Sequence, residues 1–353
     1  MRNRSYLLAL LTIAACQIPD VTFHKAPTDA EGADAGPLLT LPNCVGLPKT
    51  CGYGSSGDCC ESFVVSGDTF ARNFDLAGDG HSGDMSNPAT VSSFRLDKYE
   101  VTVGRFRAFV NAGMGTMANP PVPDSGAHAN IAGSGWKVAW SNLGSGLGLA
   151  ANKAQLLVNL NCSPAGEKPG GQTWTDAPGP NENRPMNCIS WYEAMAFCVW
   201  DGGYLPTEAE WNYAASGGRE QRAYAWSSPA GSLILDNLHA SYASASGDCT
   251  GDGMPGCATT DLLEVGTRPA GDGRWGHSDL TGNLSEWGLD WEQTVVQSPC
   301  VDCANLTSGT ERVLRGGSAV SDAATLRITY RNHASPDRLS SQFHIGARCA
   351  RAQ

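Results

Sequence analysis

Positive charge is scarce in this sequence, and so are the motifs of common catalytic sites. The 353 residues contain 24 Lys and Arg against 35 Asp and Glu, which gives a formal net charge of −11 at pH 7. An acidic surface repels phosphate backbones, so we expect no nucleic-acid partner. The sequence has no G-x-S-x-G elbow, no HExxH and no P-loop, which argues against the enzymes that depend on those motifs.

Long apolar runs and internal repeats are also missing. After the N-terminal segment, no stretch is long and apolar enough to cross a bilayer, and no solenoid-type repeat recurs. The chain is instead rich in loop formers and tryptophan, with 42 Gly, 20 Pro and 10 Trp, and 41% of its residues are hydrophobic. This composition predicts a loop-rich fold with a substantial core, and not a helical bundle.

The N-terminal segment has the pattern of a bacterial lipoprotein. Two arginines precede an apolar run over residues 6–15, which ends in Ile-Ala-Ala followed by Cys16. This pattern predicts a signal peptide at 1–15 and a lipid on Cys16, with a chance cysteine after an ordinary signal peptide as the alternative. Gln17 stands where an inner-membrane retention aspartate would stand. We therefore expect an outer-membrane lipoprotein of the bacterial cell envelope, attached to the membrane through its lipid.

Composition divides the rest of the chain into three parts. Residues 16–43 are rich in Pro, Ala, Gly and Asp without periodicity, which is typical of a flexible tether. Residues 44–61 hold four cysteines in Gly-rich sequence. No second linker follows, so we predict one continuous domain over 62–353, with the Gly-, Pro- and Asn-rich span 113–183 forming surface loops.

Cysteine is plentiful for an exported chain. Of the 13 cysteines, twelve remain when Cys16 is set aside, and an even number in an oxidising compartment predicts disulfides. The obvious local pair is Cys249 with Cys257, and weaker predictions are Cys162–Cys188 and Cys300–Cys303. Zinc is the alternative for the C-x-x-C pair and for the N-terminal cluster Cys44, Cys51, Cys59 and Cys60, although no histidines stand at ligand spacing.

Capping patterns predict three helices. Thr102 precedes an amphipathic run that Gly113 ends, while Ser190-x-x-Glu and Thr207-x-x-Glu are capping boxes. Short strands are expected at 313–315 and 326–330. The fold class is therefore α+β with much irregular chain, and we expect five tryptophans in its core. They are Trp191, Trp200, Trp211, Trp287 and Trp291.

Four motifs occur in an order that identifies a family. They are FRLDKYEVTVGRFRAFV at 94–110, RPMNCISWYEAMAFCVWDGGYLPTEAEWNYAASGG at 184–218, DLTGNLSEWGLDW at 279–291 and RVLRGGS…LRITYRNHASP…HIGARCAR at 312–351. Together they resemble the formylglycine-generating enzyme, or sulfatase-modifying factor, family. The resemblance implies an irregular, calcium- and disulfide-stabilised C-type-lectin-like fold. It also implies a disulfide between Cys198 and Cys349. We further expect Arg315 and Arg348 to pair with Glu208 or Glu210.

The resemblance implies two calcium sites, since calcium binds several hard oxygens. The first would use carboxylates and backbone carbonyls of Asp279, Gly282, Leu284 and Glu286. The second would use side chains of Asn237 and Asp252 with the carbonyls of Leu238 and Met254, although the Cys249–Cys257 insertion changes its surroundings. The alternative is that these acids only cap turns.

The family's copper site is altered. Family oxidases hold Cu(I) with two cysteines after Gly-Gly-Ser, and those positions are Ser321 and Leu326 here. A hydroxyl is a poor Cu(I) ligand and a leucine is none, so we do not expect copper. Ser318 of the Gly-Gly-Ser motif remains, and Ser321 is the other candidate catalytic residue.

Two interpretations follow. In the first, the protein is a non-oxidase member that binds an envelope protein or a glycan at the old cleft, as related variable binding proteins do with similar C-terminal segments. The ligand-binding surface would then include Asp322, Thr325, Arg331, Asn332, His333 and His344. In the alternative, it is an oxidase of protein cysteines with a rearranged metal site, in which Asp322, His333 and His344 replace the thiolates. The related iron-dependent sulfoxide synthases are disfavoured, because the chain contains no H-x3-H-x-E triad.

Overall fold

Side-chain caps begin the three helices that the sequence predicts. Those helices are α1 (Val103–Asn111), α3 (Trp191–Trp200) and α4 (Glu208–Ala215). Thr102 accepts a backbone N–H in the first turn of α1. Ser190 with Glu193, and Thr207 with Glu210, form reciprocal capping boxes before α3 and α4, which satisfy donors that a helix start would leave unpaired. The predicted caps are therefore confirmed.

The computed structural model describes residues 44–353 except 79–84, 144–146, 163–169, 308 and 338–342. The predicted signal peptide, Cys16 and the tether at 16–43 lie outside the described residues. The described residues belong to one compact unit, Thr40–Gln353. Within the described ranges, no helix combines the length and apolar character needed to cross a membrane.

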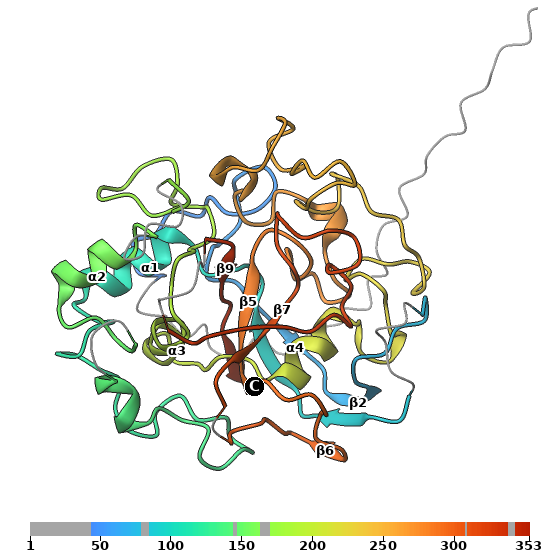
Figure 1. Cartoon of the computed structure of the whole chain (residues 1–353), viewed down its shortest axis with the longest axis horizontal. Helices are drawn as coiled ribbons and strands as arrows, with labels where there is room; N and C mark the ends of the chain where they lie inside the picture. The colour runs from blue at the N-terminus through green and yellow to red at the C-terminus, as the bar shows by residue number, and fades with distance from the viewer. Residues whose placement is uncertain (1–43, 79–84, 144–146, 163–169, 308, 338–342) are drawn as a thin grey trace, which may run out of the picture. The chain divides into compact units, whose positions relative to one another are not determined.

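Short strands form three small sheets. The strands are β1 (Ser62–Val65), β2 (Asp68–Ala71), β3 (Pro88–Val91), β4 (Phe94–Asp97), β5 (Ser285–Trp291), β6 (Cys300–Val301), β7 (Arg312–Arg315), β8 (Asn332–Ala334), β9 (Ile345–Gly346) and β10 (Ala350–Ala352). Their orders are β1-β4-β10, β2-β3-β6 and β8-β7-β5-β9. The last sheet lies in the middle of the described unit, with α4 packed beside β5 and β7 (Figure 1).

Two segments differ from the sequence-based expectation. A short helix, α2 (Lys153–Asn159), interrupts the span 113–183 that was expected to be loops. Residues 326–330 form turns and not a strand. The N–H of Leu326 donates to the C=O of Asp322, and the N–H of Tyr330 donates to Arg327, so local turns use groups that a strand would offer to a neighbour.

Tryptophans form much of the core, but not all as expected. Trp191, Trp211 and Trp287 are buried, whereas Trp200 and Trp291 are only half-buried, which corrects that part of the prediction. The reason is clearest at Trp291. Its ring covers the Arg312 guanidinium, whose central carbon lies 3.6 Å from the ring centres of both Trp291 and Trp191. The outer tryptophan therefore shields a buried cation at the edge of the core.

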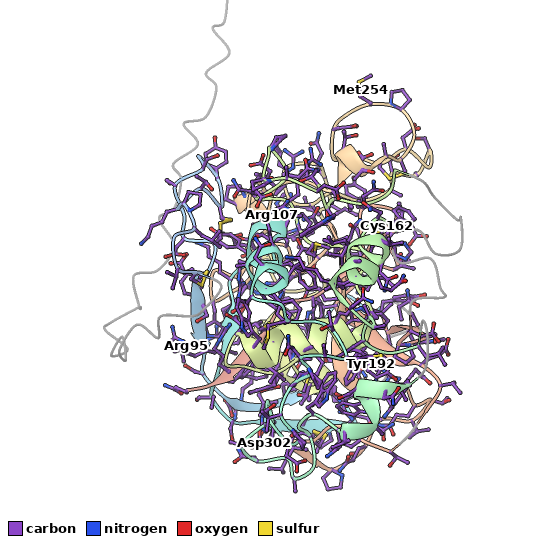
Figure 2. The ribbon with its side chains drawn as sticks, turned by 90° about the vertical axis from the view of Figure 1, so that its left-hand side faces the viewer. Arg95, Arg107, Cys162, Tyr192, Met254 and Asp302 are labelled. Atoms are coloured by element: carbon purple, nitrogen blue, oxygen red, sulfur yellow. A yellow bond between two sulfur atoms is a disulfide. The ribbon has the colours of Figure 1, made fainter. Side chains whose placement is uncertain are left out.

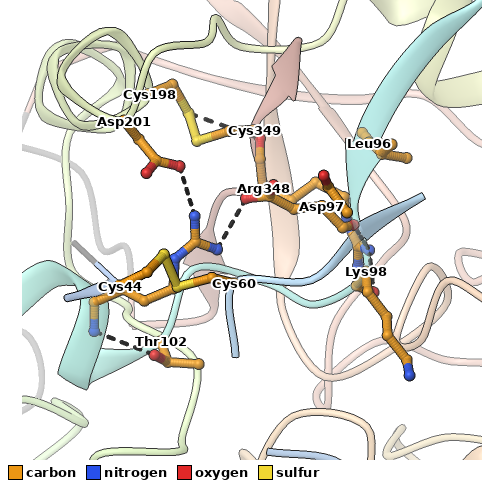
Figure 3. Close-up of polar contacts among 12 residues, drawn as sticks. Cys44, Cys60, Leu96, Asp97, Lys98, Thr102, Cys198, Asp201, Arg348 and Cys349 are labelled. Carbon is orange, nitrogen blue, oxygen red and sulfur yellow. Dashed lines mark hydrogen bonds and ion pairs between the residues drawn. A yellow bond between two sulfur atoms is a disulfide. The ribbon is translucent and has the colours of Figure 1, made fainter. Parts of the chain in front are cut away.

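All twelve cysteines of the described ranges form disulfides. The pairs are Cys44–Cys60, Cys51–Cys59, Cys162–Cys188, Cys198–Cys349, Cys249–Cys257 and Cys300–Cys303. The zinc alternative is therefore wrong in this structure, since a disulfide offers no thiolate. Figure 3 shows how Cys198–Cys349 ties α3 to the C-terminal segment, beside the buried carboxylate of Asp201.

Candidate functional site

The Gly-Gly-Ser turn after β7 forms the base of the candidate site. Gly316 and Gly317 have φ values of +92° and +66°, a left-handed conformation that favours glycine. A methyl group on Gly317 would lie 2.9 Å from Cδ2 of Leu326 and 3.3 Å from Cβ of Ser321. The close approach therefore requires glycine, and it brings residues 321 and 326 together on one side of the turn.

The buried side chain of Arg315 holds this turn in place through hydrogen bonds to other segments. Its guanidinium donates to the C=O of Tyr330 at 2.5 Å and to the side chain of Asn73 at 2.7 Å, and it lies 3.8 Å from the Glu208 carboxylate. Burial lowers the pKa of Arg315 to about 10, so it stays charged at neutral pH. The expected proximity of Arg315 to Glu208 is confirmed, and the arginine links β7 to the turn at 326–330.

Arg348 has a different partner from the one expected. Its guanidinium forms an ion pair with Glu286 at 2.6 Å, and both side chains are buried. Trp211 also donates its indole N–H to Glu286 at 2.8 Å. Glu208 and Glu210 are therefore not the partners of Arg348. The GxRC arginine and the DLTGNLSEW glutamate, far apart in sequence, meet in the core.

The two positions that correspond to copper-binding cysteines do converge, but neither provides a soft ligand. Leu326 is fully buried and packs against Gly317. The Oγ of Ser321 accepts the N–H of Ser318 at 2.9 Å and lies 3.4 Å from the Oγ of Ser318. Among the described residues, no histidine or carboxylate lies within hydrogen-bonding distance of either hydroxyl. The site thus holds neither a thiolate pair nor an activated serine.

An open pocket of about 500 Å³ lies over Ser321, and we call it the serine pocket. Its lining consists of small, hydroxyl and amide side chains with one carboxylate and one phenol. The lining residues are Ala243, Ser244, Ala245, Gly247, Val320, Ser321, Asp322, Thr325, Tyr330 and Asn332. Four predicted site residues therefore meet in one place: Ser321, Asp322, Thr325 and Asn332.

The opposite wall of the serine pocket was not predicted. It comes from residues 243–247, and the N–H of Ala243 donates to the C=O of Ser321 at 2.8 Å. The Cys249–Cys257 disulfide closes the loop that follows, and Ala243 pairs with Cys249 in a bridge. The only sequence signal for this wall was the disulfide-bounded insertion, which says nothing about where the loop docks.

Asp322 shapes the rim of the serine pocket. One of its oxygens accepts the backbone N–H groups of Ala324 and Thr325 and the hydroxyl of Thr325. These hydrogen bonds, the backbone one from Thr325 first, lower the pKa of Asp322 below its ordinary value. The carboxylate is therefore ionised at neutral pH and exposed at the pocket mouth, where its second oxygen faces solvent or a ligand.

The remaining predicted ligand-contacting residues lie elsewhere. Arg331 binds Glu208 through two nitrogens, at 2.5 and 3.1 Å, and lines a neighbouring pocket. His333 faces Glu311 at 2.8 Å, and the C=O of His344 accepts the N–H of Ser285 next to β9. Within the described ranges, the His, Cys, Asp and Glu side chains converge at one place alone, which is Asp97, Asp201 and Cys349. That group does not fit a metal, because Cys349 is in a disulfide and both aspartates pair with arginines. Asp322, His333 and His344 therefore do not form a shared metal site.

The residues of the first predicted calcium site are close in sequence but engaged with protein groups. Asp279 accepts the N–H of Gly266 at 2.6 Å, and burial raises its pKa to about 6. Glu286 offers both oxygens to Arg348. A carboxylate paired with a guanidinium does not fit a cation cage, so this ligand set as arranged here does not match calcium.

The residues of the second predicted calcium site are spread over exposed loops. Asp252 accepts the N–H of Met254 at 2.8 Å and a hydrogen bond from Thr260, so it caps its own turn. Met254 lies at the end of a projecting loop (Figure 2), and Leu238, like Met254, is 64% exposed. Asn237 is also exposed. The described geometry fits the turn-capping alternative for Asp252.

Comparisons with known proteins agree with the motifs. Residues 56–353 match the family profile described as "Sulfatase-modifying factor enzyme 1-like domain". A "Formylglycine-generating enzyme" of Streptomyces coelicolor is 32% identical over 337 residues, covering 92% of this chain and 95% of that protein. An "Inactive C-alpha-formylglycine-generating enzyme 2" of Mus musculus is 28% identical, covering 78% and 80%. The solved structure of PvdO from Pseudomonas aeruginosa is similar with a TM-score of 0.54 at 19% identity, covering 87% and 99%. These likenesses confirm the irregular C-type-lectin-like fold.

Proposed function

Since this chain belongs to the family of the sulfatase-modifying factor enzyme 1-like domain, we propose that it is a non-oxidase member that binds a ligand in the serine pocket. The observation that carries the proposal is the pair of residues at Gly317. Ser321 and Leu326 converge there, where copper-binding family members have two cysteines, and Leu326 is fully buried. The place of one metal ligand is thus filled by hydrocarbon.

The surroundings support the loss of copper chemistry. Cu(I) prefers thiolate and thioether ligands, and every cysteine of the described ranges is held in a disulfide. The candidate replacement ligands Asp322, His333 and His344 do not gather into a metal group. The site's residues therefore do not fit copper, and no catalytic step is assigned to it.

The lining of the serine pocket fits a polar ligand. Hydroxyl, amide and carboxylate groups from Ser244, Ser321, Asp322, Thr325 and Asn332 surround the space, and these groups both donate and accept hydrogen bonds. Such a lining suits a glycan or a polar segment of an envelope protein, because it combines hydrogen-bonding groups with the small apolar side chains of Ala243, Ala245 and Val320. The fold itself does not decide between the two.

The direct test offers the purified chain a sulfatase-motif cysteine peptide with Cu(I) and oxygen, and follows the peptide by mass spectrometry. We expect no conversion to the aldehyde and no stoichiometric copper binding. The double variant Ser321→Cys plus Leu326→Cys should bind Cu(I), while Ser321→Cys alone should bind it far more weakly, because Leu326 still fills the second position. Aldehyde formation by the unaltered chain would overturn the proposal.

An oxidase with a rearranged metal site is the second candidate. The identity of 32% with a formylglycine-generating enzyme over most of both chains favours it, because chemistry is often kept at that similarity. If the unaltered chain converts the peptide, His333→Ala and His344→Ala should abolish conversion. Conversion that survives both changes would exclude this ligand set as well.

We further propose that the protein is exported and anchored to the outer membrane through a lipid on Cys16, as the N-terminal pattern predicts. In a bacterial host, the chain should fractionate with membranes, and Cys16→Ser should release it. A Cys16→Ser variant that stays with the membrane fraction would exclude lipid anchoring. Disulfide bonding throughout the described ranges is consistent with an oxidising compartment.

Calcium remains a prediction that the family resemblance alone supports. Binding at Asp279 would require Arg348 to release Glu286 or would have to use other oxygens. Metal analysis of protein purified without chelator decides the matter. Less than about one calcium per chain would exclude both predicted sites, since a structural site of this type is expected to be filled.

A further inference from the structure

A second pocket of about 370 Å³ lies on the other side of Tyr330, and we call it the arginine pocket. Its lining includes two arginines and no carboxylate, although the whole chain carries a net charge of −11. The lining residues are Arg72, Asn73, Asn87, Thr294, Val295, Val296, Thr329, Tyr330 and Arg331. Tyr330 lines both pockets, so they are neighbours on one face.

Arg72 is the unusual member of this lining. It is 2% exposed, and its Nε has no hydrogen-bond partner. One terminal nitrogen donates to the C=O of Gln297 at 2.6 Å, while the other contacts only the sulfurs of Cys300 and Cys303, at 3.9 and 3.6 Å. Sulfur is a weak acceptor, so a buried cation retains unused donor capacity. Leaving such a group unpaired is costly.

Arg331 adds a second cation with remaining donors. Its contacts to Glu208 and to the C=O of Gln293 use one N–H on each of its three nitrogens. The guanidinium has five N–H groups in all, so two remain. Its side chain is 18% exposed, which leaves it accessible from the pocket.

Carboxylates near the arginine pocket are already engaged with other groups. The Glu208 carboxylate already forms an ion pair with Arg331, and it lies 3.8 Å from the guanidinium of Arg315. Asp290 accepts the backbone N–H groups of Glu208 and Asn305, and among the described residues it forms no ion pair with an arginine. Glu292 lies 3.8 Å from Arg331, so the three arginines face three carboxylates in all. None of these carboxylates belongs to the lining of the arginine pocket, which contains Arg72 and Arg331.

The apolar part of the lining narrows the class of ligand. Val295 at the mouth is 78% exposed, and Val296 beneath it is 9% exposed. Arginines bind carboxylates through paired hydrogen bonds, while the valines offer a surface for carbon atoms attached to the anion. A fully hydrated inorganic anion would not use the valines.

We propose that the arginine pocket binds an organic carboxylate, such as the glutamyl side chain of a peptide, between Arg72 and Arg331. This inference does not depend on a ligand in the serine pocket. If one ligand occupied both pockets, its polar part would lie in the serine pocket and its carboxylate in the arginine pocket, on the other side of Tyr330. Binding at the serine pocket and binding at the arginine pocket can therefore be tested separately, and the result for one does not decide the other.

The test titrates the full chain with acetyl-Ala-Glu-Ala-amide by calorimetry at low salt, and with the same peptide carrying Gln in place of Glu. We expect the glutamyl peptide to bind at least tenfold more tightly, and added salt to weaken it. Equal binding of the two peptides would overturn the proposal. Saturable binding of inorganic phosphate without the glutamyl peptide would also overturn it, because the pocket would then be a simple anion site.

Surface variants keep the test independent of folding. Val295→Asp places a carboxylate at the mouth of the arginine pocket and should weaken glutamyl-peptide binding at least tenfold. Val301→Asp is the matched control, since Val301 is a similarly exposed valine, at 69%, that does not line the pocket. Arg72→Met should abolish binding if it folds. If Val295→Asp and Val301→Asp bind the glutamyl peptide with the same affinity, the peptide carboxylate binds outside the arginine pocket and the assignment is refuted.

Discussion

The layer beneath the serine pocket and the rim of that pocket use polar residues in opposite ways. Beneath it, Arg315 and Arg348 are buried, and each is held by carboxylate, carbonyl or amide oxygens of distant segments. On the rim, Asp322 and Thr325 bond only within their own turn, and Asp322 is exposed. Changes in the lower layer should therefore affect folding, whereas changes on the rim should affect what is bound.

The largest effect is expected from the disulfide that closes the lower layer. Cys198 and Cys349 are separated by 151 residues, so replacing both with Ala should lower the free energy of unfolding by roughly 5 kcal/mol in the chain-entropy treatment. Replacing Cys249 and Cys257, which are 8 residues apart at the rim, should cost about half as much. Urea unfolding followed by fluorescence measures both. Equal losses would contradict the distinction between layer and rim.

The next effect concerns the buried ion pair. Arg348→Met removes the cation beside Glu286 and leaves a buried carboxylate without its counter-charge, which should cost about 3–5 kcal/mol. The control is Arg219→Met, which breaks the exposed pair with Asp68 and should have a far smaller effect, because solvent screens that pair. The same unfolding measurement applies. A loss under about 1 kcal/mol in Arg348→Met would show that this layer tolerates change as the rim does.

A pH dependence should come from Asp290, on β5. Burial, and then the neighbouring Glu208 carboxylate, raise the pKa of Asp290 from 3.8 to about 6. Between these values the folded state holds a proton that the unfolded chain has released. The contribution of Asp290 to the free energy of unfolding therefore falls as pH rises from about 4 to about 6.

Asp290→Asn should remove this fall, so the stability difference between variant and parent should shift in favour of the variant by on the order of 2 kcal/mol between pH 4 and pH 7. Asp124→Asn, an exposed aspartate, is the control for the chemical change. Unfolding by urea at both pH values gives the comparison. Parallel pH profiles for Asp290→Asn and the parent would show that Asp290 titrates normally.

The smallest effect is expected on the rim. Thr325→Val removes the hydroxyl that donates to Asp322 at 2.9 Å, so the pKa of Asp322 should rise toward its ordinary value. Stability should change by less than about 1 kcal/mol, because the bond is solvent-accessible. NMR titration of the Asp322 carboxyl measures the shift. A pKa that does not move would mean that the backbone bonds alone set it.

Local patterns in the sequence were enough to predict the helices α1, α3 and α4 and the disulfide chemistry, although they missed α2. The boxes at Ser190 and Thr207 act within one helical turn, so nearby residues contain the whole signal. The ordered motifs predicted the fold and the altered pair Ser321 and Leu326, because side-chain chemistry at a matched position can be read directly. Export and an even cysteine count predicted disulfides for the same reason.

Long-range packing decided the rest. The sequence did not reveal that Arg348 pairs with Glu286, or that residues 243–247 form a wall over Ser321. It also did not place Arg72 beside Arg331. Each of these depends on segments that are far apart in the chain and meet only when the core closes, so no local pattern could encode it. The chain's own residues therefore predicted the family and the pair Ser321 and Leu326, while tertiary packing determined the serine pocket and the arginine pocket.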